Sequence, residues 1–308
     1  MVTFPKSIIR KQDRYRRLTV PQFTVVTGFL VILTGTLLLS TPICSTQNVG
    51  LWEALFTATS AVTVTGLTII DVGKDLTIFG QIILASMLLI GGLGLMAITT
   101  FLQGFVVRGT ELRCRLDRGK TLDEFGVGGV GRNFRGIALT AIVLIGIGAI
   151  LLFFFGFTDI PSTGNRLWAA LFHSISAYNN AGFGLWQESM QSYRTNWVVN
   201  LVIIMLIILG GLGWRVTSDL WSNRKNLSMR KLSLHTRLVI RTSVVLILLG
   251  TFGLLITESI GQGTFFRSIG WEERFITAFF ESVSARTAGF TNMPISIETL
   301  SDSGLLLL

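Results

Sequence analysis

The chain has 308 residues, of which 50% are hydrophobic and 14% are charged, and its mean hydropathy is +0.62. Soluble domains carry about 25% charged residues, so this composition argues against an ordinary soluble protein. The net charge of +9 would suit a nucleic-acid partner, but no platform of aromatic and basic residues accompanies it. We therefore expect a membrane protein that binds no nucleic acid.

Long stretches without Asp, Glu, Lys or Arg predict the membrane helices. A helix that crosses a bilayer needs about 20 apolar residues, and four windows supply them: 18–52, 76–107, 136–158 and 195–214. A fifth stretch, 242–257, is shorter, but Arg241 and Glu258 at its ends can snorkel to the surface. We predict five membrane helices and the start of a sixth in the closing SGLLLL, hence an all-α integral membrane protein.

Most basic residues lie in three segments that alternating helices place on one side of the membrane. The segment before the first helix, the linker 108–135 and the stretch 215–241 hold 20 of the 26 Lys and Arg. The positive-inside rule makes that side cytoplasmic. We predict a multi-pass protein of the cell membrane with its N-terminus in the cytoplasm.

One unit recurs three times along the chain. Gly66, Gly182 and Gly289 stand in TVTGL, NNAGF and RTAGF, behind the amphipathic stretches LWEALFTATSAV, LWAALFHSISAY and ERFITAFFESVSA. Shifts of 116 and 107 residues superpose the three glycines, and the helices after the first two loops contain IGGLG and LGGLG. Each unit is therefore predicted as a membrane helix, a short re-entrant helix, a glycine-bearing loop and a second membrane helix.

The re-entrant loops carry the functional prediction. The amphipathic stretches are too short to cross a bilayer, which needs about 20 residues, so they dip in and return. Unpaired backbone at membrane depth is tolerated only where protein buries it or where it lines a water-filled path. Converging loops can offer a ring of carbonyls that replaces the hydration shell of a cation, and glycine permits the backbone angles and close approach that this requires. The repeat thus predicts an ion selectivity filter.

The three loop motifs, each behind its amphipathic helix, resemble those of the Trk/Ktr/HKT superfamily of potassium transporters, most closely the bacterial Ktr-type membrane subunit. The resemblance covers nearly the whole chain and implies four helix–pore-loop–helix repeats with one filter glycine in each. It assigns the filter to Thr63, Val64, Thr65, Gly66, Asn179, Asn180, Ala181, Gly182, Arg286, Thr287, Ala288 and Gly289. The K⁺ ligands that it implies are the backbone carbonyls of Val64, Thr65, Asn180, Ala181, Thr287 and Ala288.

The resemblance also implies a function: K⁺ uptake down its electrochemical gradient, with Na⁺ coupling left open, no cofactor and no enzymatic activity. Serine at the first filter glycine accompanies Na⁺ preference in the plant branch, so Gly66 resembles the K⁺-preferring pattern. Family members dimerise and work with a cytosolic nucleotide-binding regulatory subunit, for which the basic loops 108–135 and 215–241 would be the docking surface. The alternatives are a non-conducting fragment or scaffold subunit, and a polytopic membrane enzyme.

We predict a cytoplasmic segment 1–20, a first pore-loop repeat 21–107, a cytoplasmic linker 108–135, a second repeat 136–221, a linker 222–239 and an incomplete third repeat 240–308. The family pattern continues with a second helix in repeat three and a fourth repeat, whereas this sequence stops at Leu308. We therefore expect a truncated version of a longer transporter, which lacks the family's gating loop and the basic residue below its filter.

Other motifs admit two interpretations each. The GxGxxG in 126–131 matches a dinucleotide fingerprint, but no room exists for the βαβ unit that it needs, so a flexible linker is favoured. A charge at membrane depth is a functional hypothesis by default; for Arg286 we favour a brace that faces the outer vestibule and binds carbonyls. Asn179 and Asn180 are expected to hold their loop in shape.

The remaining polar residues and the GGLG pairs are interpreted in the same way. His173 is expected to pack rather than to do chemistry, and Glu53 and Glu258 to be solvated helix ends. Attraction of cations to the outer mouth is the other interpretation of Glu53 and Glu258, and it applies to Glu281 as well. The GGLG pairs are either hinges or sites of close helix packing by small residues, of which packing is the commoner use.

Overall fold

The computed structural model describes residues 20–47, 49–94, 127–224, 232–260, 264–296 and 299–307. Regular structure in these ranges is helical, apart from one isolated bridge between Ser45 and Leu76. The predicted all-α fold is confirmed. Most of the predicted N-terminal segment and parts of both basic linkers lie outside the described residues.

Five apolar segments form the frame, and three shorter helices lie where the amphipathic stretches predicted them. The frame consists of α1 (Val20–Leu39), α4 (Ile78–Gly92), α6 (Val127–Leu151) with the π-helical turn η2 (Leu152–Gly156), α8 (Trp197–Gly211) and α10 (Leu234–Ile260). The three pore helices, as we call them, are α2 (Leu51–Thr63), α7 (Thr163–Tyr178) and α12 (Trp271–Ser284). Short elements complete the chain: α3 (Val72–Asp75), η3 (Gln191–Tyr193), α9 (Trp214–Ser222), α11 (Thr264–Ser268) and α13 (Asp302–Leu307).

Local caps decide where two of the pore helices begin. The Gly50 amide donates to Glu53 Oε2 at 2.9 Å, so the exposed Glu53 side chain caps the first turn of α2. This agrees with its interpretation as a solvated helix end. The Ser162 hydroxyl accepts from the Asn165 amide at 3.4 Å. Because serine is a preferred N-cap residue, α7 begins at Thr163 rather than at Leu167, where the repeated pattern starts.

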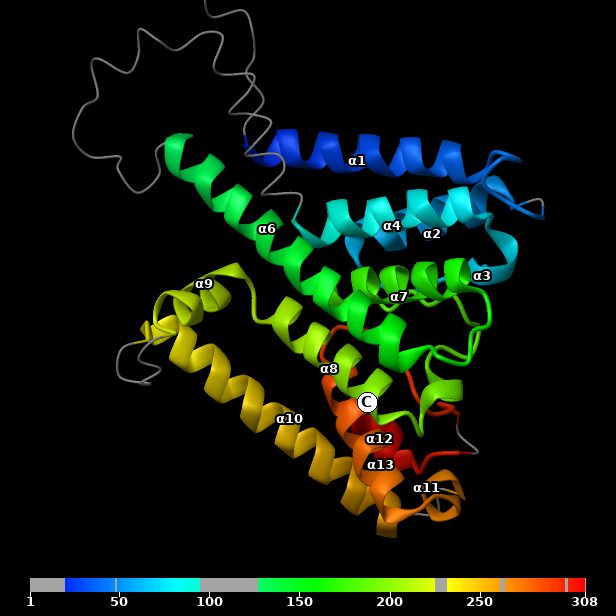
Figure 1. The fold of residues 1–308 in the computed structure, drawn as a ribbon, viewed down its shortest axis with the longest axis vertical. Coiled ribbons are helices and arrows are strands. Elements are labelled where there is room, and N and C mark those ends of the chain that lie inside the picture. Colours follow the sequence, from blue (N-terminus) through cyan, green and yellow to red (C-terminus); the bar gives the residue numbers. More distant parts are fainter. Residues whose placement is uncertain are drawn as a thin grey trace, which may run out of the picture.

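The three repeats pack in the same way. Helix α2 contacts α1 and α4, α7 contacts α6 and α8, and α12 contacts α10. The second and third pore helices also contact the preceding repeat, because α7 touches α4 and α12 touches α8. Figure 1 shows the resulting order, with α1, α2 and α4 at one end, α6, α7 and α8 in the middle, and α10, α12 and α13 at the other end. The predicted pseudo-symmetric repeats are confirmed.

The lengths of the apolar helices differ from the prediction of five spans. Two described helices, Gly136–Gly156 and Leu234–Ile260, are long and apolar enough to cross a membrane. Helix α8 has 15 residues, shorter than the 20-residue window that predicted it, and the chain bends by 98° before the next helix. The continuation of α4 lies outside the described residues. The window 195–214 thus holds a helix that ends at Gly211, and with the helix after the bend it can form one broken span.

The GGLG motifs explain where α4 and α8 end. A Cβ at Gly91 would overlap the carbonyl oxygen of Val62, and a Cβ at Gly210 would overlap that of Tyr178. Val62 and Tyr178 lie 116 residues apart at equivalent positions of the first two pore helices, so both repeats use the same contact. The last glycine of each motif, Gly94 or Gly213, has a positive φ of 82° or 78°, the conformation that commonly ends a helix. The packing interpretation is confirmed.

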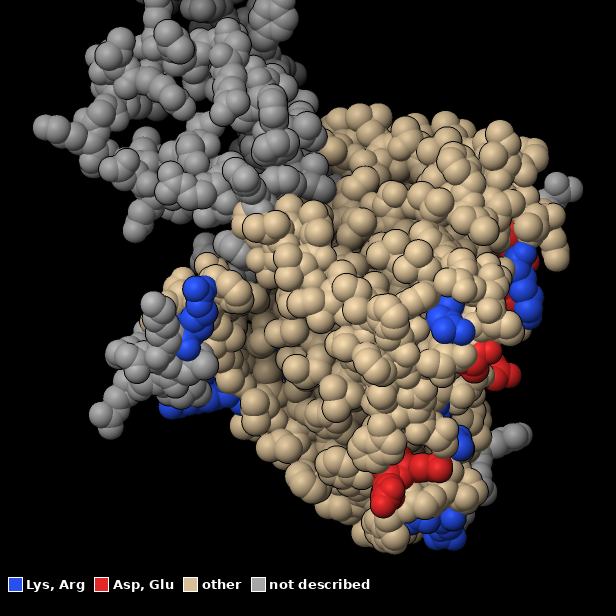
Figure 2. Space-filling view, in the orientation of Figure 1, with Lys and Arg blue, Asp and Glu red and all other residues tan. Residues whose placement is uncertain are grey.

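The outward faces of the long helices are apolar. Ile142 and Phe154 on the second repeat are 68% and 61% exposed, and Leu249 on α10 is 65% exposed. Figure 2 shows a wide surface between the charged rims on which neither acidic nor basic side chains appear. A contiguous exposed apolar surface of this kind suits contact with lipid.

The GxGxxG stretch is not the flexible linker that the sequence analysis favoured. Helix α6 begins at Val127 and continues through Gly128, Gly129 and Gly131 to Leu151. The hydrogen bonds between amides and carbonyls in a helix do not require side chains. A glycine-rich turn can therefore be added to a helix whose later, apolar turns are stabilised by packing.

We predict that Gly210→Ala destabilises the protein. The added Cβ meets the Tyr178 carbonyl, which belongs to backbone and cannot rotate away, and overpacking of this kind costs about 1–3 kcal/mol. Thermal unfolding of the purified full chain in detergent measures the effect. Gly146→Ala is the matched control, because a Cβ at Gly146 in α6 has no atom within 4 Å; equal midpoints for the two variants would contradict the close contact.

Candidate functional site

The three predicted filter glycines share one backbone conformation. Their φ angles are 84° at Gly66, 70° at Gly182 and 73° at Gly289, in the left-handed region that glycine adopts most readily. Two residues earlier, Val64 and Asn180 also have positive φ, at 55° and 54°. A β-branched residue in this region is a genuine outlier. Such strain at a loop persists only where the surrounding structure enforces it.

The glycines bring the three loops together in chain order. A Cβ at Gly66 would lie 2.6 Å from the carbonyl oxygen of Ala181, and a Cβ at Gly182 would lie 2.7 Å from that of Ala288. The added atom at Gly182 would also be 2.9 Å from the Cα of Gly289. At these glycines each loop therefore approaches the next one through backbone atoms, and a side chain at Gly66 or Gly182 would separate them.

The pore helices hold the loops by their last carbonyls. The Thr65 amide donates to the Ser60 carbonyl at 2.9 Å, and the equivalent Ala181 amide donates to Ser176 at 2.9 Å. In the third loop the Ala288 amide donates to Ser284 at 2.8 Å. These bonds occupy the amides of the loops and leave the carbonyls unused.

The carbonyls implied as K⁺ ligands are those of Val64, Thr65, Asn180, Ala181, Thr287 and Ala288. Within the described part of the chain, none of these six oxygens accepts a hydrogen bond. Peptide carbonyls are strong acceptors that native structures nearly always pair. A cluster of unused ones, facing neighbouring backbone, can therefore coordinate cations or water.

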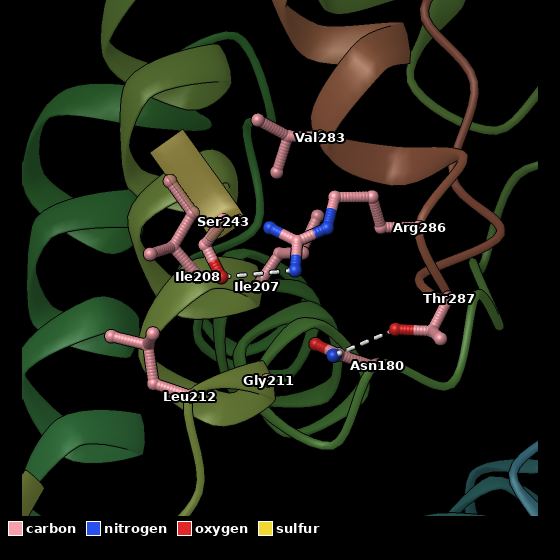
Figure 3. A pocket seen from close by; sticks show the side chains of 9 residues that line it. All are labelled: Asn180, Ile207, Ile208, Gly211, Leu212, Ser243, Val283, Arg286 and Thr287. Atoms are coloured by element: carbon pink, nitrogen blue, oxygen red, sulfur yellow. Dashed lines mark hydrogen bonds between the residues drawn. The ribbon is translucent and has the colours of Figure 1, made fainter. Parts of the chain in front are cut away.

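A side-chain bond joins the second and third loops. Asn180 Nδ2 and Thr287 Oγ1 lie 3.1 Å apart, and Figure 3 marks the bond between the two side chains. The amide orientation that satisfies both atoms of Asn180 places its nitrogen on the carbonyls of Ala177 and Ile207, and its oxygen then accepts from the Thr287 hydroxyl. Asn179 donates to the Ile175 carbonyl at 2.8 Å. Both asparagines thus hold the loop in shape, as the sequence analysis expected.

Arg286 does not lie where the sequence analysis placed it. Its Nη2 donates to the Ser243 hydroxyl on α10 at 3.0 Å, and Figure 3 shows the side chain directed toward that helix. Arg286 lines a cavity of about 130 Å³ with Gly211 and Leu212, at the end of α8 that leads into the basic linker. The outer-vestibule placement was wrong, because the side chain follows the pore helix inward and meets a hydroxyl instead of carbonyls.

A second cavity, of about 200 Å³, lies between the ends of α4, α7 and α8. Its lining includes Asn179 and Asn180 from the second loop, together with Gly92 and Gly210 from the two GGLG motifs. The carbonyl cluster therefore has space beneath it on the side where the second helices break.

Glu258 also differs from its interpretation as a solvated helix end. The residue is fully buried, and its Oε1 accepts from the hydroxyl and amide of Ser301 at 2.6 and 3.1 Å. Ser301 precedes α13, so the carboxylate anchors the start of that helix to α10. No local pattern in the sequence indicates this contact, because 43 residues separate its partners.

Two arginines for which no role was expected from the sequence anchor the starts of pore helices. Arg166 donates through Nε and Nη2 to the Ile160 carbonyl at 3.1 and 2.8 Å, and through Nη2 to that of Thr158 at 3.2 Å. Arg274 binds the Ile269 carbonyl through Nε at 2.9 Å. A cation in the first turn of a helix interacts unfavourably with the helix dipole. An arginine at that position in the sequence therefore indicates that a specific contact compensates for this cost.

The family model for TrkH, described as a cation transport protein, matches residues 6–308. The chain belongs to this family. Within it, the chain is 35% identical over 285 residues to the Ktr system potassium uptake protein B of Bacillus subtilis (strain 168), across 92% of this chain and 62% of that protein. It is 33% identical over 309 residues to the potassium/sodium uptake protein NtpJ of Enterococcus hirae, across 98% of this chain and 65% of that one.

The fold agrees with this family assignment. The crystal structure of the potassium transporter TrkH from Vibrio parahaemolyticus superposes with a TM-score of 0.62 at 18% identity, over 92% of this chain and 54% of that one. The family member described here thus spans about three-fifths of the length of these curated relatives.

We predict that Arg166→Ala lowers the free energy of unfolding by about 2 kcal/mol, because the hydrogen bonds it loses have a charged donor. Thermal or denaturant unfolding of the full chain in detergent measures the loss. Arg224→Ala is the control, since exposed Arg224 stacks on Trp221 with its guanidinium 4.6 Å from the ring centre, and its change should stay within about 0.5 kcal/mol. Equal losses of unfolding free energy in Arg166→Ala and Arg224→Ala would show that the carbonyl contacts of Arg166 do not stabilise the protein.

Proposed function

We propose that this chain forms the ion path of a K⁺ uptake protein in the cell membrane, with the three glycine loops as its selectivity filter. The observation that carries the proposal is the convergence of the loops: Gly66 abuts the Ala181 carbonyl, and Gly182 abuts the Ala288 carbonyl. A filter needs carbonyls from separate loops at the spacing of one dehydrated cation. The absence of a side chain at each glycine permits that spacing.

The choice of K⁺ as the substrate rests on chemistry and on the relatives together. Neutral carbonyls are weaker ligands than carboxylates and suit a large monovalent cation that must leave again. Relatives that match most of this chain are named for potassium uptake, and one of them for potassium and sodium. Glycine rather than serine at position 66 supports K⁺ preference. Coupling to Na⁺ is an outcome for the experiment to decide.

The orientation and the partners are part of the same proposal. The N-terminus lies in the cytoplasm, with the basic linkers on that side. The chain acts as a homodimer with a cytosolic nucleotide-binding regulatory subunit, which the basic loops 108–135 and 215–241 receive. The name "Ktr system" of two relatives supports a membrane subunit that works with other components.

A non-conducting scaffold subunit is the second function, and uptake separates it from the first. The protein is expressed from its own gene in bacteria that lack their K⁺ uptake systems. We expect Gly66→Ser to lower K⁺ uptake and the K⁺/Na⁺ uptake ratio by about tenfold or more, because the side chain is strained at positive φ and displaces the Ala181 carbonyl. Gly146→Ser on α6 is the control. Wild-type uptake and selectivity in Gly66→Ser would disprove the filter.

Arg286 provides a test of the inner side of the path. Within the described residues no carboxylate forms an ion pair with it, so its positive charge would repel a cation that passes nearby. We expect Arg286→Gln to raise the maximal rate of K⁺ uptake several-fold, whereas Arg286→Lys retains the wild-type rate. Equal effects of both variants would show that the charge sets no barrier.

A further inference from the structure

In repeats two and three, a buried side chain of the pore helix binds the segment that follows the filter glycine. We call this segment the limb of the loop, and the bond to it the tie. The bonded amide stands three residues after the filter glycine in both cases, at Leu185 after Gly182 and at Asn292 after Gly289. The two amides are thus equivalent in the repeat, although the side chains that bind them differ in kind.

In repeat two the partner is His173 of α7. Its Nε2 accepts from the Leu185 amide at 3.3 Å, and its Nδ1 lies 2.8 Å from the Ala169 carbonyl. A carbonyl can only accept, so Nδ1 carries the proton and Nε2 is free to accept. The ring is fully buried and stacks on Trp186 at 4.3 Å between centres. His173 therefore packs, as the sequence analysis expected, and also binds the loop.

In repeat three the partner is Glu281 of α12, one position later on the pore helix. The residue is 2% exposed, and its Oε1 accepts from the Asn292 amide at 2.9 Å. The Asn292 side chain continues the connection, because it donates to Asn200 Oδ1 on α8 at 2.9 Å. The interpretation of Glu281 as a cation attractor at the outer mouth does not fit this burial, since the carboxylate faces the back of the loop.

Repeat one has no such tie within the described residues. The positions equivalent to His173 and Ser174 are Thr57 and Ala58, and the Thr57 hydroxyl is buried without a hydrogen-bond partner. The limb after Gly66 instead bonds within itself, since the Ile70 amide donates to the Thr68 hydroxyl at 3.2 Å. The loops of repeats two and three are therefore held from behind in a way that the first loop is not.

We propose that His173 and Glu281 are positioning residues that fix the second and third loops and thereby set the selectivity between K⁺ and Na⁺. This inference rests on the proposed function. Discrimination between the two ions depends on the number and the placement of the carbonyls around them. Between the glycine and the bonded amide the two loops have no helix or strand, so the bonds to Leu185 and Asn292 restrict how far the carbonyls can move toward a smaller ion.

The repeats supply the variants for the test. His173→Phe installs the residue that repeat three has at this position, Phe280, and removes the tie while keeping a ring. Adding Ser174→Glu places a carboxylate at the position in repeat two that is equivalent to Glu281. The double variant can therefore form in repeat two the hydrogen bond that repeat three has. In repeat three, Glu281→Gln keeps an accepting oxygen and Glu281→Leu removes it. Ser174→Ala is the control, because the Ser174 hydroxyl is buried on the same helix without a partner.

The readout is the K⁺/Na⁺ uptake ratio of the full-length protein at equal membrane content, with monodisperse elution in detergent as the check on folding. We expect His173→Phe and Glu281→Leu to lower the ratio about tenfold, the order of effect that one buried hydrogen bond supplies. Two variants should retain most of the wild-type K⁺/Na⁺ uptake ratio: the double variant His173→Phe/Ser174→Glu and the single variant Glu281→Gln.

Each result decides the proposal. A wild-type ratio in folded His173→Phe and Glu281→Leu overturns it, and so does a double variant no more selective than His173→Phe, because packing would then be the cause. If Glu281→Gln lowers the K⁺/Na⁺ uptake ratio as far as Glu281→Leu does, the hydrogen bond at the third loop does not set the selectivity. Absence of K⁺ uptake by the wild type would overturn the proposed function first and this inference with it.

Discussion

Backbone that leaves a helix inside a hydrocarbon layer must find partners for its peptide groups, and most of this structure serves that requirement. The pore helices end inside the molecule, and the amides that follow them bind the last helix carbonyls, as Thr65 does with Ser60. The carbonyls then face the neighbouring loop rather than the chain's own donors. Such carbonyls are tolerated at membrane depth where protein buries them or where they line a water-filled path.

The same requirement explains the glycines outside the loops. The second helix of a repeat must come within backbone contact of the pore helix, and Gly91 and Gly210 allow this at equivalent places. Each of these helices then ends through a glycine with positive φ, Gly94 or Gly213. The break leaves a cavity beneath the loops, lined by Gly92, Gly210 and Asn179, so the packing that supports the loops also opens the space below them.

Several buried or half-buried polar side chains of this protein bind backbone atoms. His173 and Glu281 bind amides behind the loops, Arg166 binds carbonyls at the start of a pore helix, and Glu258 holds the start of α13. Burial of a polar group is unfavourable unless it is hydrogen-bonded. Each of these residues therefore specifies one position of an irregular segment, which apolar packing alone would leave free to shift.

The sequence by itself determined the class of the protein, the three repeats, the pore helices and the loop glycines. Apolar length, amphipathic spacing and the recurrence of TVTGL, NNAGF and RTAGF are properties of chain order, so they can be read without coordinates. Only the tertiary structure decided that α8 breaks after Gly211, that Arg286 turns inward to Ser243, and that Glu258 is buried against Ser301. These depend on contacts between residues about 40 positions apart, or on the direction in which a helix presents a side chain, and neither leaves a periodic trace in the sequence.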